Sequence, residues 1–162
     1  MRRDVEIEKY DESMCTIFVD ADACPVKKDI VEIAAAYHCS VIFISSYNHM
    51  IHDKPGGEWV FVDTNQEEVD LYIVNHVKPY DLVITQDIGL AGLLLKRNVY
   101  VLSPRGKEYN EANIEPALFS RFVHAKQRQA GQKTRGPKAY TKQDKEHFRV
   151  ELEKILSNLA GI

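Results

Sequence analysis

"CTIFVDADACPVKKDIVEIAAAY", residues 15–37, combines a short apolar run, two aspartates and a helical pattern, and it decides the fold of the chain. The run 15–20 is rich in β-branched and aromatic residues and predicts a buried strand. Apolar residues then recur with helical spacing over 26–37. The stretch therefore predicts a strand, a turn that carries Asp20 and Asp22, and a helix.

The same alternation of strand and helix patterns continues to residue 102. Strands alternating with helices imply βαβ units and a parallel sheet covered on both faces. We therefore predict a three-layer α/β/α fold with a central, mostly parallel sheet of about five strands, followed by C-terminal helices. The further strands are expected at 41–45, 58–63, 81–85 and 99–102, and the further helices at 66–77, 88–98, 113–129 and 141–159.

The length of 162 residues and the apolar share of 44% fit one globular domain, which we place at 15–162 after a polar N-terminal tail, 1–14. No apolar stretch approaches the roughly 20 residues that span a bilayer. The tail is charged and has no apolar core of a signal peptide. Three cysteines leave one unpaired in any disulfide scheme. We expect a cytoplasmic protein without membrane contact, and the interpretation allows for a homodimer.

Positive charge is concentrated near the C-terminus. No acidic residue lies between Glu115 and Asp144, whereas seven Lys and Arg residues do, so the net charge of −3 divides into +7 on this segment and −10 on the remainder. Such segregation is typical of a cationic surface for a polyanion, and the alternative is a solvated helix and loop. The seven are Arg121, Lys126, Arg128, Lys133, Arg135, Lys138 and Lys142.

Several aspartates fall where predicted strands end. Ligands of open parallel sheets bind at the carboxyl ends of the strands, and carboxylates gathered there repel one another unless a cation neutralises them. Oxygen ligands suit Mg²⁺ or Mn²⁺. A single Asp after a strand is more often a turn former or helix cap, which we assign to Asp63, and Asp81 begins a strand. The candidates are Asp20 and Asp22, Asp87 after the strand 81–85, and Asp70 within the helix 66–77.

Cys24 lies at the start of a predicted helix, where a thiol can become a nucleophile. Nearby acids oppose this by raising its pKa, so we favour a packing or capping role. The pairs His38/Cys39 and His49/His52 lack the repeated spacing of a zinc site, and we reject zinc as the main cofactor.

Four motifs, in this order, resemble the bacterial YaiI/YqxD family: "VDADACPV", "DLVITQDIGLA", "SPRGKEYNEANI" and "GQKTRGPKAYTKQD". The resemblance covers nearly everything from residue 15 to the C-terminus. It implies a fold grouped with PIN-like domains, which resemble metal-dependent nucleases.

In PIN-like domains an Asp ends the first strand, an acid lies in a central helix, and an Asp follows the fourth strand in a T-x-D setting. Asp20, Asp70 and the run Thr85-Gln86-Asp87 match these roles. A fourth acid is not found after Asp87, and we take Asp22 or Asp81 as its substitute.

The leading hypothesis is therefore a Mg²⁺- or Mn²⁺-dependent nuclease that hydrolyses phosphodiesters, with RNA favoured over DNA as substrate. Asp20, Asp22 and Asp87 would hold metal, and Asp70 would assist through water. Thr85 would support the strand end, and Gly106 would allow close approach of the backbone. The residues expected to bind phosphate are Arg105, Lys133, Arg135 and Lys138.

Two alternatives stay open. A D-x-D after an apolar strand also resembles haloacid-dehalogenase phosphatases, in which the first Asp is the nucleophile, although the later paired acids of that family are missing. The other alternative is a non-catalytic RNA-binding module, for which the basic segment is sufficient.

Overall fold

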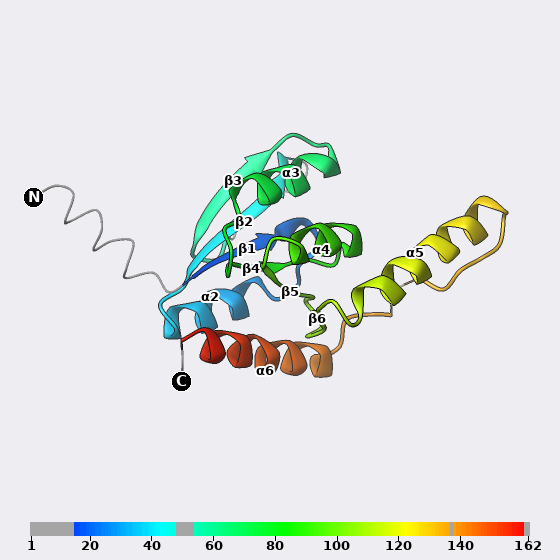
Figure 1. Cartoon of the computed structure of the whole chain (residues 1–162). Helices are drawn as coiled ribbons and strands as arrows, with labels where there is room; N and C mark the ends of the chain where they lie inside the picture. The colour runs from blue at the N-terminus through cyan, green and yellow to red at the C-terminus, as the bar shows by residue number, and fades with distance from the viewer. Residues whose placement is uncertain (1–14, 48–53, 137, 161–162) are drawn as a thin grey trace, which may run out of the picture.

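Six strands form one sheet in the computed structural model, which describes residues 15–47, 54–136 and 138–160 (Figure 1). The order is β3-β2-β1-β4-β5-β6, with β1 to β5 parallel and β6 antiparallel to β5. The prediction of a mostly parallel α/β sheet is confirmed, with one more strand than expected. The strands are β1 (Thr16–Asp20), β2 (Ser40–Ser46), β3 (Glu58–Val62), β4 (Leu82–Ile84), β5 (Tyr100–Leu102) and β6 (Glu108–Tyr109).

Side chains cap the first residues of three of the helices. The Asn65 side chain accepts a hydrogen bond from the third helix, the Asp87 side chain does so from the fourth, and Thr141 forms a capping box with Asp144. The helices are η1 (Ala21–Ala23, a 3₁₀ turn), α2 (Lys27–Ala36), α3 (Gln66–His76), α4 (Ile88–Leu95), α5 (Ile114–Gln129) and α6 (Lys142–Leu159).

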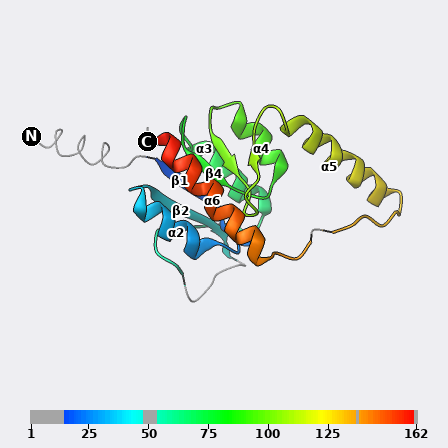
Figure 2. The same cartoon turned by 90° about the horizontal axis from the view of Figure 1, so that it is seen from below.

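Buried residues form two groups, because successive side chains of a strand point to opposite faces of the sheet. Ile17 and Val19 of β1 belong to one group, together with Phe148 of α6 and residues of α2. Phe18, between them, belongs to the other group, with residues of α3 and α4. Figure 2 shows α2 and α6 side by side. In each of the two groups, helices therefore pack against apolar side chains of β1.

The helix α5 and residues 130–136 project away from the rest of the protein in both views, and we call them the α5 arm (Figures 1 and 2). At the base of the arm Ile114 is buried and Leu118 is partly buried, both in the group of α3 and α4. Further along, Phe119 and Phe122 are 68% and 57% exposed. The arm is thus anchored at its base and surrounded by solvent beyond it.

The predicted tail, 1–14, and the histidines His49 and His52 lie outside the described residues. No helix in the part of the chain that the structure describes is long and apolar enough to cross a membrane.

Candidate functional site

Asp20 and Asp87 lie at the point where the order of the sheet reverses. Asp20 is the last residue of β1, and Asp87 follows the neighbouring strand β4. From β1 the chain order runs outward through β2 and β3, and from β4 it runs outward through β5. Loops at the carboxyl ends of two such strands diverge and leave room for a ligand between them. The parallel topology therefore brings together two predicted site residues that are 67 positions apart.

Thr85 fixes the two aspartates relative to each other. Its hydroxyl is buried, donates to Asp20 Oδ2 at 3.1 Å and accepts from the backbone N–H of Asp87 at 3.0 Å. The neighbouring Gln86 donates from Nε2 to the carbonyl of Ala23 at 2.8 Å, which ties the β4–α4 turn to η1. The hydroxyl of Thr85 thus links the end of β1 to the residues that follow β4.

Asp70 completes the cluster from α3. Burial, the charges of Asp87 and Asp20, and a hydrogen bond with the carboxyl of Asp87 raise the pKa of Asp70 to about 7, and Arg121 opposes the rise. In its protonated form Asp70 can therefore donate to the Asp87 carboxylate. Asp70 of α3 is therefore within electrostatic reach of the aspartates at both strand ends.

The carboxyl of Asp20 also holds a proton more tightly than an exposed aspartate. Burial raises its pKa to about 6, the hydroxyl of Thr85 opposes this, and the charges of Asp22 and Asp87 add to it. Carboxylates that repel one another are stabilised by a proton or by a cation. The Asp20, Asp70 and Asp87 carboxyls, which we call the aspartate cluster, therefore form an electrostatically strained site.

We expect Asp20→Asn to stabilise the protein at mildly alkaline pH in the presence of a chelator. The folded pKa of about 6 exceeds the ordinary 3.8, so the folded state is favoured by protonation, and this contribution is lost as the pH rises through about 6. Asparagine removes the charge and should raise the free energy of unfolding by about 2 to 3 kcal/mol above that pH. Urea unfolding across the pH range measures it.

The matched control is Asp63→Asn, at an exposed residue that follows β3. It should change stability by less than about 0.5 kcal/mol at every pH. A gap between Asp20→Asn and wild type that stays constant with pH would contradict the electrostatic account of the cluster.

Asp22 is held by the end of β2. The hydroxyl of Ser45 donates to Asp22 Oδ1 at 2.7 Å, and the backbone N–H of Ser46 donates to the same atom at 3.0 Å. Both serines are buried. Asp22 therefore lies beside the cluster and adds its charge to the surroundings of Asp20, while both of its oxygens accept hydrogen bonds from the end of β2. The sequence analysis did not identify the two serines.

Arg121 of α5 forms an ion pair with the cluster, a role that was not predicted from the sequence. Its Nη1 lies 3.8 Å from Asp87 Oδ1. The guanidinium passes over Gly89, where an added Cβ would lie 2.5 Å from Nη1. Glycine at the start of α4 thus makes room for the arginine. The "DIGLA" motif contains this glycine, but the distance to Arg121 along the chain hides the connection.

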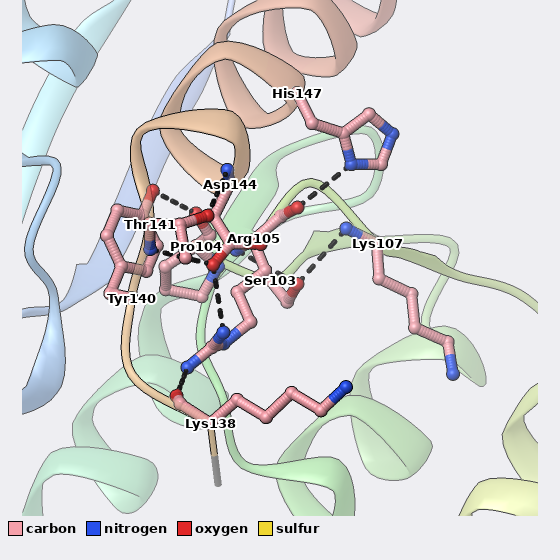
Figure 3. A network of polar contacts seen from close by, with 9 residues as sticks. All are labelled: Ser103, Pro104, Arg105, Lys107, Lys138, Tyr140, Thr141, Asp144 and His147. Atoms are coloured by element: carbon pink, nitrogen blue, oxygen red, sulfur yellow. Dashed lines mark hydrogen bonds and ion pairs between the residues drawn. The ribbon is translucent and has the colours of Figure 1, made fainter.

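Arg105, predicted to bind phosphate, is engaged elsewhere (Figure 3). Its Nη1 forms an ion pair with Asp144 Oδ2 at 2.9 Å, Nη2 donates to the carbonyl of Lys138, and the guanidinium lies over the ring of Tyr140. The Tyr140 hydroxyl donates to the carbonyl of Pro104 at 2.7 Å. The structure thus uses Arg105 to fix the segment that returns from the α5 arm.

Gly106 is explained by packing against α6. Its φ is +89°, and an added Cβ would lie 2.6 Å from His147 Nδ1 and 2.9 Å from the backbone carbon of His147. The close approach that the sequence suggested is therefore an approach to a helix of the same chain.

The other predicted phosphate-binding residues, Lys133, Arg135 and Lys138, are exposed, the first two on the α5 arm and the third in the segment that returns from it. The described contacts do not connect their side chains to the aspartate cluster. Cys24 is buried, and burial raises its pKa to about 11, which agrees with the expected packing role and opposes nucleophilic chemistry.

The fit of a divalent cation can be judged from the donor set. In the described residues no group of three or more His, Cys, Asp or Glu side chains is arranged to hold a metal ion. The cluster nevertheless offers only oxygen donors, and its raised pKa values show charge that a cation would neutralise. Mg²⁺ commonly takes one or two carboxylates and completes its shell with water and substrate oxygens. Asp20 and Asp87 fit this smaller requirement.

Known proteins resemble the chain over almost its whole length. The family model described as "Uncharacterized BCR, YaiI/YqxD family" matches residues 18–158. A UPF0178 protein of Bacillus cytotoxicus is 52% identical over 151 residues, which are 93% of this chain and 99% of that protein. A UPF0178 protein of Bacillus velezensis is 50% identical over 157 residues, 96% of this chain and 94% of that protein. One of Listeria monocytogenes is 43% identical over 145 residues, 90% and 99% respectively. No solved structure matches the chain.

Proposed function

The chain belongs to the YaiI/YqxD family, and for this member we propose a divalent-metal-dependent nuclease that hydrolyses phosphodiesters, with RNA favoured as substrate. The observation that carries the proposal is the convergence of Asp20, Asp70 and Asp87 at the switch point of the sheet, with raised pKa values at the first two. An acidic cluster at a ligand-binding edge, with a single ion pair to Arg121 among the described residues, is a candidate for cation-assisted chemistry.

The proposal assigns separate tasks to the residues of the site. Asp20 and Asp87 hold Mg²⁺ or Mn²⁺, with Asp22 as a further candidate ligand beside them. When bound, the cation supplies charge neutralisation at the phosphate and a more acidic water. Thr85 keeps Asp20 and Asp87 in register. Asp70, with a pKa close to neutrality, is suited to accept or donate a proton at the atoms that face Asp87.

The proposal also includes finer expectations about the fold and the cell. The helices that pack in the two buried groups would form the three layers of a PIN-like domain, and the protein would act in the cytoplasm.

The test is a cleavage assay on mixed-sequence single-stranded RNA, the matching DNA and p-nitrophenyl phosphate, each with Mn²⁺, Mg²⁺ or EDTA. We expect internal cleavage of RNA with metal and none with EDTA. Asp20→Asn, purified in the same way, is the control for a contaminating nuclease, because it should not cleave RNA. RNA that is bound but stays intact with every metal would contradict the proposal and favour a binding module. Hydrolysis of p-nitrophenyl phosphate but of neither nucleic acid, with phosphate trapped on Asp20, would favour a phosphatase.

A further inference from the structure

A groove of about 770 Å³ runs between α5, the start of α4 and the β5–β6 turn. Among the residues that line it none is acidic, and four are basic. The opposite side of α5 is different, because Glu111 and Glu115 line a separate hollow there together with leucines of α4. The basic lining residues are Lys107, Arg121, His124 and Arg128.

The basic side chains of α5 are placed at helical spacing along the groove. His124 and Arg128 lie three and seven residues after Arg121, so the three side chains share one face of the helix. Seven residues of α-helix span about 10 Å, which is long enough for side chains of one face to meet more than one phosphate of a strand. The face therefore matches a short run of phosphates.

The groove adjoins the aspartate cluster. Ile88, which directly follows Asp87, is one of its lining residues, and Arg121 lines the groove while its Nη1 lies 3.8 Å from Asp87 Oδ1. Among the described residues, the contact of Arg121 with Asp87 is the only ion pair that any of the four basic side chains forms. The charges of Lys107 and Arg128 are thus available to an anion that reaches out from the cluster.

We infer that this groove binds the sugar-phosphate backbone of a single-stranded nucleic acid over the nucleotides that follow the phosphate at the aspartate cluster. The inference rests on the proposed function and deepens it, because it requires an oligonucleotide rather than a mononucleotide as substrate. Neither Phe119 nor Phe122 lines the groove, so base stacking does not contribute there and binding is independent of base sequence.

The test measures fluorescence anisotropy of labelled single-stranded RNA and DNA of mixed sequence in EDTA, at several salt concentrations. The variant Lys107→Gln/Arg128→Gln changes the groove and leaves the aspartate cluster intact. Lys96→Gln/Lys154→Gln is the control, since it removes the same charge from exposed positions outside the groove. Thermal melting confirms that both variants fold.

We expect the groove variant to bind about 5- to 10-fold more weakly, with the slope of log K against log salt reduced by about 1.4, while the control binds like wild type. Equal affinity of the groove and control variants, or no binding by wild type, would overturn the inference. If the groove variant keeps both metal-dependent cleavage and unchanged affinity for the oligonucleotide, the groove would be overturned and the nuclease would stand. If the groove variant binds more weakly but the wild type cleaves no RNA, the result would support the groove and overturn the nuclease.

Discussion

Asp20→Asn should reduce metal-dependent cleavage of RNA by more than 100-fold while the protein becomes more stable. Loss of groups that only orient metal ligands costs 10- to 100-fold in many metal sites, so loss of a ligand should cost at least the upper end of that range. Asparagine has the same shape and can still accept the hydrogen bond from Thr85, 3.1 Å away in wild type. The geometry of the strand end is therefore retained and only the charge is lost. Initial rates with saturating Mn²⁺ measure the effect.

The combination of lower activity and higher stability is what separates a functional carboxylate from a structural one. Asp63→Asn provides the control for both quantities, because that residue is exposed and follows β3, which pairs with β2 and not with β1. Cleavage by Asp20→Asn within tenfold of wild type would remove Asp20 from the catalytic centre, whatever its effect on stability.

Gly106→Ala should produce the largest loss of stability among single methyl additions in the β5–β6 turn. The positive φ of +89° costs an alanine about 1 to 2 kcal/mol, and the new Cβ would contact the backbone of His147 at 2.9 Å. Helix α6 cannot retreat easily, because the adjacent Phe148 and Leu152 are fully buried. We expect a total loss of about 3 kcal/mol, seen as a fall in Tm of roughly 6 to 12 °C.

Gly131→Ala separates the two contributions to this loss. Gly131 also has a positive φ, +81°, but no atom lies within 4 Å of its added Cβ. Its cost should be only the backbone term of about 1 to 2 kcal/mol. Equal losses at the two glycines would show that close packing against α6 contributes nothing at Gly106.

The sequence was sufficient to predict a mostly parallel sheet and the aspartates at the carboxyl ends of two of its strands. Regular alternation of apolar runs and helical patterns implies a parallel sheet, and the carboxyl ends of parallel strands share one edge. Asp20 and Asp87 follow from that rule alone. The two-residue strand β6 did not, because it is too short to show a period of two, and its pairing depends on the turn at Gly106.

Long-range choices between partners could not be predicted from the sequence. Arg105 and Arg121 are both arginines in basic or polar surroundings, yet one forms an ion pair with Asp144 and the other approaches Asp87. The difference depends on the direction of α5 and on the space above Gly89, which are tertiary features. Residue type therefore identified cations near the site but assigned the phosphate-binding role to Arg105, which the structure uses as an anchor.

The most direct test of the central claim, that the aspartate cluster holds a divalent cation, is calorimetric titration of Mn²⁺ into wild type, Asp20→Asn and Asp63→Asn. Each titration is repeated with a nucleoside monophosphate, which supplies the phosphate oxygens that such cations often need. We expect wild type and Asp63→Asn to bind Mn²⁺ and Asp20→Asn to lose the binding. Equal binding by wild type and Asp20→Asn, or no binding by wild type under either condition, would contradict the claim.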